Sequence, residues 1–84
     1  MGKIGVVFKL MPEGTETDLE AIKQEVHDRI DPDDIGEEEV AFGLTAIKVS
    51  TVVDDAEGGT DELEETLSDI DGVQSVEVDD IQKL

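Results

Sequence analysis

Residues 3–20 read KIGVVFKLMPEGTETDLE, and this stretch sets the pattern of the fold. Ile4, Val6, Phe8 and Leu10 recur at every second position, and a period of two is typical of a strand with one buried face. The run MPEG at residues 11–14 has turn chemistry, so the strand is predicted to end there. The stretch therefore predicts a strand and a turn, with a helix beginning directly after them.

The predicted helix begins at Thr17. The run TDLE at residues 17–20 fits a capping box, in which the Thr17 hydroxyl and the Glu20 carboxylate each satisfy a free backbone N–H. The apolar residues that follow share one helical face: Leu19, Ile22, Val26 and Ile30. Pro32 is predicted to stop the helix, because proline cannot continue it.

Three more strands and a second helix are predicted in the rest of the chain. We expect strands over residues 37–42 and 44–53, the latter rich in β-branched residues. Residues 54–59 are expected to form a loop, and Thr60 to cap a helix with apolar residues Leu63, Leu67 and Ile70. Gly72 suits the left-handed position after that helix. Residues 73–78 alternate as a fourth strand, and residues 79–84 are expected to be a short tail.

The two predicted helix starts resemble each other, as GTETDLE at residues 14–20 and GTDELE at residues 59–64. Thr17 and Thr60 lie 43 residues apart, about half of the chain. A doubled strand-helix-strand unit of this size predicts an α+β, ferredoxin-like βαββαβ fold. We expect one domain over residues 1–84, with a four-stranded antiparallel sheet and two helices on one face. The other face is expected to be open to solvent or to a partner.

The charge balance excludes several kinds of partner. The chain has 84 residues, with 24 Asp and Glu against 6 Lys and Arg, which gives a net charge of -18. Electrostatic binding to nucleic acid or to an anionic membrane needs clustered Lys and Arg, so neither is expected. No run of 18 apolar residues and no basic-then-apolar leader is present, which predicts a soluble, cytoplasmic protein.

Such acidity raises the question of disorder, since low hydrophobicity with high net charge is its usual signature. Leu, Ile, Val and Phe together number 25 of 84 residues. This share is well above the roughly 20% found in disordered chains. Because these residues are also periodic, we expect an ordered aliphatic core beneath an acidic surface.

No catalytic or metal-binding constellation is found. Cysteine is absent, and the single histidine, His27, cannot build a multi-histidine site. The acidic runs at residues 31–34 and 54–55 lack the twelve-residue pattern of an EF-hand. The run GGT at residues 58–60 lacks the lysine of a phosphate-binding loop. With 24 acids, a carboxylate pair carries little information. We therefore predict no enzyme, no cofactor and no bound metal.

Two features stand out from this surface. Phe42, one of two aromatic residues, precedes Gly43 at a predicted strand end, where its side chain is either presented to a partner or buried. Lys83 is one of two basic residues after Gly43, in a half of the chain that holds 12 acids. It is either a cation directed at an anionic group or a lysine in a frayed tail.

Several motifs in the second half carry a family resemblance: FGL at 42–44, VVDD at 52–55, TDELE at 60–64, VQSV at 73–76 and IQKL at 81–84. In this order and spacing they resemble the carboxyl-terminal exchange domain of translation elongation factor 1-beta, in its short archaeal form. The resemblance covers essentially the whole chain and is strongest over residues 42–84.

This resemblance implies a guanine nucleotide exchange factor for elongation factor 1-alpha, the GTPase that delivers aminoacyl-tRNA to the ribosome. The GDP-bound GTPase would be the partner, and the exchange factor itself would need no cofactor or metal. By position, Lys83 matches the terminal lysine that intrudes on the magnesium and phosphate region of the GTPase. Phe42 matches the aromatic residue that packs into a pocket on that partner. Gly43, Gln82 and Leu84 flank these two and are assigned to the same partner-binding set.

Two alternatives come from other functional classes. Many ferredoxin-like domains are small-molecule-binding or regulatory modules without enzymatic activity. An acidic mimic of nucleic acid would bind a basic partner in a complex that high salt abolishes.

The acidity also predicts a setting. A net charge of -18 on one small domain implies strong self-repulsion, which largely disappears in molar salt. We therefore expect a halophilic archaeal source with high salt in its cytoplasm.

Overall fold

The alternating residues at the start of the chain form an inner strand of the sheet. The computed structural model of the chain describes residues 2–54 and 60–83. Strand β1 (Lys3–Pro12) pairs with β3 (Thr45–Asp54) on one side and with β4 (Val73–Lys83) on the other. Strand β2 (Asp34–Glu39) adds to the far side of β3, which gives the order β2-β3-β1-β4 with every pair antiparallel.

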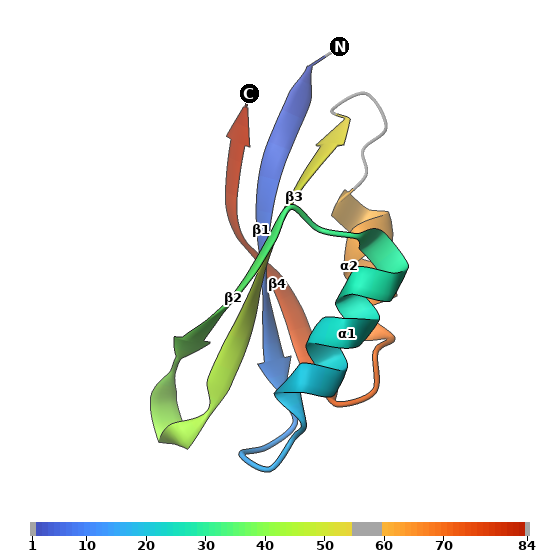
Figure 1. Cartoon of the computed structure of the whole chain (residues 1–84). Coiled ribbons are helices and arrows are strands. Elements are labelled where there is room, and N and C mark those ends of the chain that lie inside the picture. Colours follow the sequence, from blue (N-terminus) through green and yellow to red (C-terminus); the bar gives the residue numbers. More distant parts are fainter. Residues whose placement is uncertain (1, 55–59, 84) are drawn as a thin grey trace.

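Two helices cover one face of this sheet. Helix α1 (Leu19–Ile30) connects β1 to β2, and helix α2 (Thr60–Ser68) lies between β3 and β4 in the chain. Figure 1 shows both helices on the same side of the sheet. The β-α-β-β-α-β order, the sheet and the helix placement confirm the predicted ferredoxin-like fold.

The core lies between the sheet and the helices. Alternation in β1 places Val6, Phe8 and Leu10 on the helix side, and each is fully buried. Burying a phenylalanine or leucine side chain stabilises a fold by about 1.5–3 kcal/mol. The side chains packed around them are Ile22, Val26, Ile47, Val49, Leu67, Ile70 and Val73. The core is therefore largely aliphatic, as predicted, and Phe8 is its one aromatic residue.

The N-cap of helix α1 lies one residue later than predicted. Its N-cap is Asp18, whose side chain accepts a hydrogen bond from the Ala21 N–H at 3.2 Å. The Thr17 hydroxyl instead accepts the Gly14 N–H at 3.1 Å and closes the preceding turn. The prediction of Thr17 as the cap was therefore wrong, because its hydroxyl is used one turn earlier. Helix α1 ends at Ile30, and its C-cap residue Asp31 is left-handed with φ 46°, immediately before Pro32 as expected.

The apolar residues of helix α2 and the turn after the helix follow the prediction, but the predicted cap does not. Leu67 and Ile70 are buried and Leu63 is partly buried against the core. Thr60 is the first residue of the helix rather than its cap, and the residues directly before it lie outside the described ranges. Gly72 has φ 94°, which confirms the left-handed turn expected there.

Two strand boundaries were predicted wrongly. Strand β2 begins at Asp34 and ends at Glu39, so residues 40–42 lie outside it. It is an edge strand whose composition, DIGEEE, has almost no apolar alternation to mark it. Strand β4 continues to Lys83, so residues 79–83 are not a tail. An irregularity in its pairing with β1 interrupts the alternation after Val78 and hides the rest of the strand.

Candidate functional site

Phe42 projects from the turn between β2 and β3. This turn is a short 3-10 helix (Ala41–Gly43), and the Val40 N–H donates to the Leu44 carbonyl at 2.9 Å to close it. Phe42 has φ 63° and ψ 26°, a left-handed conformation that costs an L-residue about 1–2 kcal/mol. Its side chain is 93% exposed, so the structure places it outside the core. The Phe42 side chain is therefore exposed and not a core residue.

Gly43 extends the left-handed run, with φ 75°. A Cβ built there would meet the Thr15 methyl at 3.7 Å, which is ordinary contact. The backbone conformation, not crowding, is therefore the reason that glycine suits this position. Phe42 and Gly43 are thus two consecutive left-handed residues in this turn, and the aromatic ring lies outside the core.

Lys83 lies at the opposite end of the sheet, as the last residue of β4. Its Cα partner in β1 is Ile4, and its neighbour Gln82 is paired with Gly5. Lys83 is exposed and makes no ion pair with any residue in the described ranges. It is therefore a lysine held in a strand rather than one in a frayed tail. Leu84, the last residue assigned to the set, lies outside the described residues.

The structure does not bring Phe42 and Lys83 together. Lys83 and Val53 are both Cα partners of Ile4, whereas the turn that carries Phe42 joins the other end of β3, at Thr45. Eight residues of extended strand separate these ends, which is roughly 27 Å at about 3.4 Å per residue. Figure 1 shows the β2–β3 turn and the end of β4 at opposite ends of the molecule, whose longest extent is 42 Å. A partner that touches both residues must span the length of the sheet.

Three other cations are engaged with carboxylates. The pairs are Lys23 with Glu37 and Glu20, Arg29 with Glu25 and Asp69, and Lys48 with Asp79 and Glu38. Hydrogen bonds to these carboxylates raise the pKa of all three cations, led by Glu37, Glu25 and Asp79 respectively. Lys83 differs from this group, because its ammonium is directed to no carboxylate within the described residues.

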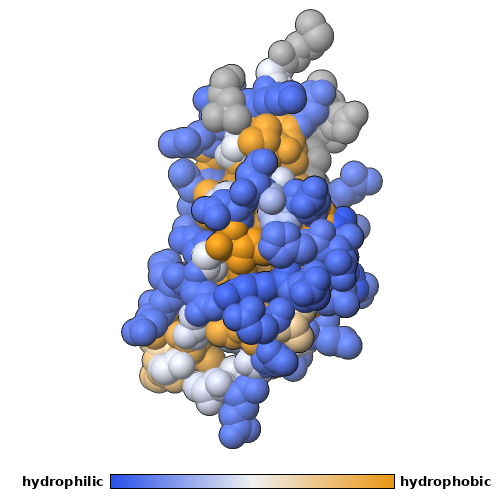
Figure 2. Space-filling model, viewed as in Figure 1, coloured by the Kyte–Doolittle hydropathy of each residue, from blue (hydrophilic) through white to orange (hydrophobic). Residues whose placement is uncertain are grey.

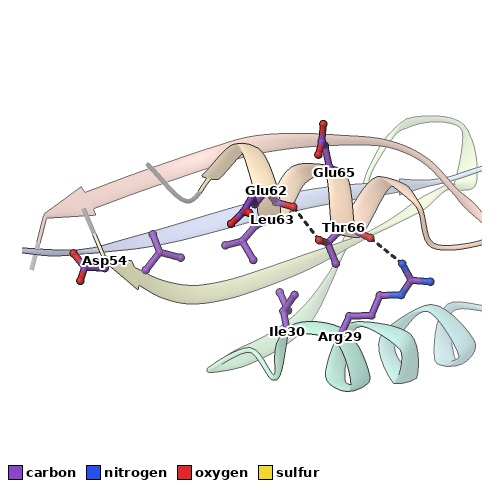
Figure 3. A pocket seen from close by; sticks show the side chains of 8 residues that line it. Arg29, Ile30, Asp54, Glu62, Leu63, Glu65 and Thr66 are labelled. Atoms are coloured by element: carbon purple, nitrogen blue, oxygen red, sulfur yellow. Dashed lines mark hydrogen bonds between the residues drawn. The ribbon is translucent and has the colours of Figure 1, made fainter. Parts of the chain in front are cut away.

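A hollow of about 540 Å³ lies between the two helices and the end of β3, and neither Phe42 nor Lys83 lines it. Figure 3 shows Arg29 reaching from α1 toward the Thr66 carbonyl of α2, to which its guanidinium donates at 3.2 Å. Glu25 and Asp69 accept the other hydrogen bonds of this guanidinium. Arg29 is the one cation among the residues that line this hollow, and its guanidinium already donates hydrogen bonds to groups of the protein. We therefore assign no anionic ligand to the hollow.

The part of the chain that the structure describes was compared with the features of metal sites and membrane-spanning helices. Within residues 2–54 and 60–83, no cluster of three or more His, Cys, Asp or Glu side chains is arranged to hold a metal ion. None of the helices described is long and apolar enough to cross a membrane. Figure 2 shows one face of the molecule, on which hydrophilic side chains cover most of the surface and separate the apolar areas.

Comparison with known proteins places the chain in a family. The family model described as "EF-1 guanine nucleotide exchange domain" matches residues 5–84, which include both Phe42 and Lys83. A curated protein named elongation factor 1-beta from Methanothermobacter thermautotrophicus is 48% identical over 88 aligned positions, covering 100% of this chain and 99% of the relative.

Other relatives of the same name are more distant. The protein from Methanosarcina barkeri is 38% identical and that from Natronomonas pharaonis is 35% identical, each covering all of both chains. Full-length similarity at this level agrees with the fold and with the resemblance carried by the motifs of the second half. The chain belongs to the family of EF-1 guanine nucleotide exchange domains.

Proposed function

We propose that this chain is a guanine nucleotide exchange factor that promotes GDP release and GTP loading on elongation factor 1-alpha during translation elongation. The family match over residues 5–84 carries this proposal. The chain acts as one exchange domain, on the GDP-bound GTPase, in the cytoplasm. It makes and breaks no covalent bond, and it shifts its partner toward a state that holds GDP weakly.

Lys83 is the residue that acts on the nucleotide site. GDP is held in a GTPase largely through its phosphates and the bound magnesium ion. An ammonium that enters this region repels the metal ion and competes for its carboxylate ligands. Lys83 suits this role because it is exposed, stands at the end of a paired strand and has no ion pair of its own among the described residues.

Phe42 supplies the second contact, at the other end of the sheet. Aromatic anchors that fill a partner's pocket commonly dominate the affinity of an interface. A ring that is 93% exposed loses almost no internal packing when it enters such a pocket. Gly43 provides the left-handed residue behind it, and Gln82 and Leu84, the sequence neighbours of Lys83, belong to the same proposed contact. In this proposal the GTPase is bound at two points. Phe42 contributes affinity, and Lys83 promotes nucleotide exchange.

Direct contact with nucleic acid or membrane forms no part of this function. A net charge of -18 repels both surfaces, and the GTPase is the component that handles tRNA. The same net charge supports the inference of an archaeal source with molar salt in its cytoplasm. At such salt the screening length is about 3 Å, so the surface acids repel one another only weakly.

A GDP-release assay tests the role of Lys83. The rate of release of labelled GDP from the cognate GTPase is measured with the wild-type chain, with Lys83→Ala and with Lys3→Ala. We expect Lys83→Ala to slow release by about tenfold or more, which corresponds to a barrier higher by at least about 1.4 kcal/mol. Lys3 is a matched control, because it is also exposed and begins β1 at the same end of the sheet. Equal rates for the wild type and Lys83→Ala would rule out this role.

A further inference from the structure

The pairing of β4 with β1 contains an extra residue close to Lys83. Val78 is the Cα partner of Phe8 and Asp80 is the partner of Val7, so Asp79 has no partner of its own. This arrangement is a β-bulge, in which two residues of one strand oppose one residue of the next. Bulges of this kind commonly redirect a side chain near a functional site.

The bulge decides on which face of the sheet the last residues of β4 lie. With the bulge, Ile81 is opposite the buried Val6, and Lys83 is opposite Ile4, on the helix side. If Asp79 instead took Val7 as its partner, each later residue would shift by one. Lys83 would then oppose Lys3 on the open side of the sheet, because side chains alternate between faces. The face of the sheet on which Lys83 lies thus depends on where the extra residue is accommodated.

One side chain of β3, on the face of the sheet opposite the helices, contacts the extra residue. The Lys48 Nζ of β3 donates to Asp79 at 2.5 Å and to Glu38 of β2 at 3.2 Å. Lys48 reaches across β1 to do so, since its own Cα partner there is Lys9. The hydrogen bond from Lys48 lowers the pKa of Asp79, and the charge of Lys9 contributes further.

We propose that Lys48 is a positioning residue for Lys83, because its ion pair with Asp79 stabilises the bulge that keeps Lys83 on the helix side. This inference rests on the exchange function proposed above. Lys48 touches neither the nucleotide nor the GTPase in this scheme. It acts through Asp79, four residues before Lys83. The contact with Glu38 adds the outer strand β2 to the same arrangement.

Three variants of the full chain, compared with wild type at one KCl concentration, test the proposal. Lys48→Met removes the ammonium and keeps a similar apolar stem. Deletion of Asp79 removes the extra residue, so that residues 80–83 pair regularly with the same partners in β1. The double variant combines both changes. Lys23→Met is the matched control, because Lys23 also makes two carboxylate pairs but contacts β2 and its own helix rather than β4.

Two readouts are taken for each variant: hydrogen exchange of the backbone amides of residues 80–83, and the rate of GDP release from the GTPase. We expect Lys48→Met to speed the amide exchange by about twofold to fivefold, the effect of one or two exposed ion pairs. GDP release should slow by a similar factor. Lys23→Met should leave both readouts as in the wild type. The double variant should return both to wild-type values, because no bulge remains to be stabilised.

Two results would overturn the proposal. One is wild-type amide exchange at residues 80–83 in Lys48→Met. The other is a double variant as slow in GDP release as Lys48→Met alone, because Lys48 would then act by another route. If the GTPase releases GDP equally fast with Lys83→Ala and with the wild-type chain, the function proposed for Lys83 is wrong, which is a separate outcome. The amide exchange of the Lys48 variants still decides whether the ion pair holds the bulge.

Discussion

Phe42 combines two properties that are unfavourable for the free chain: a strained backbone and an exposed aromatic ring. Its backbone is left-handed, and its ring lies in solvent. Strained conformations of this kind persist where the surrounding structure enforces them, and they cluster at functional sites. Here the turn that joins β2 to β3 enforces the conformation and points the ring away from the sheet. The stability lost at this residue is consistent with a contact made only in the complex.

Replacing this residue should separate stability from binding. Phe42→Gly should raise the free energy of unfolding by about 1 kcal/mol, because glycine adopts a positive φ without the steric cost. Phe42→Ala should leave it nearly unchanged, since the ring packs against little and the strain remains. Both variants should bind the GTPase at least about 30-fold more weakly, the loss of one aromatic anchor worth 2 kcal/mol or more. Urea unfolding and calorimetric titration measure the two quantities.

The opposite pattern would contradict this view of Phe42. If Phe42→Ala unfolded the chain, the ring would be a core residue. If both variants bound the GTPase as tightly as the wild type, the ring would not be an anchor.

Phe42 and Lys83 could be selected as candidates from the sequence, because Phe42 is a rare aromatic residue before a glycine and Lys83 is a rare cation. Their exposure could not be predicted, because it depends on the conformation of the turn at Phe42 and on the strand pairing at Lys83.

Among the elements, the link between α2 and β4 depends on one glycine. Gly72 has φ 94°, and a Cβ there would lie 3.0 Å from the Thr17 methyl. Gly72→Ala should therefore lower the free energy of unfolding by about 1–2 kcal/mol, through backbone strain and the close contact. Gly36 is the control, because it lies in β2 and a Cβ there meets nothing within 4 Å. Gly36→Ala should be neutral or stabilising by about 0.5–1 kcal/mol. Equal destabilisation by the two variants would show that the left-handed backbone and close contact at Gly72 do not require glycine there.

The success of element prediction followed the strength of the local pattern. Strand β1 and the apolar faces of the helices were predictable, because their periodicity reflects one buried side. Strand β2 was misplaced because an acidic edge strand needs little apolar alternation. Strand β4 was cut short because Asp79 and Asp80 stand next to each other, which breaks a period of two. A bulge restores the register beyond them, and only the pairing with β1 reveals it.

At the scale of the whole molecule, repulsion between carboxylates opposes folding. The described ion pairs involve only three of the six basic side chains, against 24 acids. The screening length falls from about 30 Å at 0.01 M salt to about 3 Å at 1 M salt, which removes most of this repulsion. The few ion pairs also weaken in salt, but they are outnumbered by the repulsive contacts.

Stability should therefore rise with salt. We expect the helix and strand signals in circular dichroism, and the midpoint of thermal unfolding, to increase as KCl is raised from 10 mM to 2 M. The screening length is about 30 Å at the lower concentration and under about 3 Å at the higher one. A variant with several surface Asp and Glu changed to Asn and Gln should show a smaller increase. A wild-type spectrum and midpoint that do not change with KCl would refute the adaptation to high salt.

The most direct test of the exchange function is a titration. Labelled GDP is bound to the cognate elongation factor 1-alpha, excess unlabelled GDP is added, and the release rate is followed as the chain is titrated in. An exchange factor should accelerate release by about tenfold or more at saturation, because it lowers the barrier by at least 1.4 kcal/mol. A release rate that stays at the intrinsic value at every concentration of the chain would contradict the proposed function.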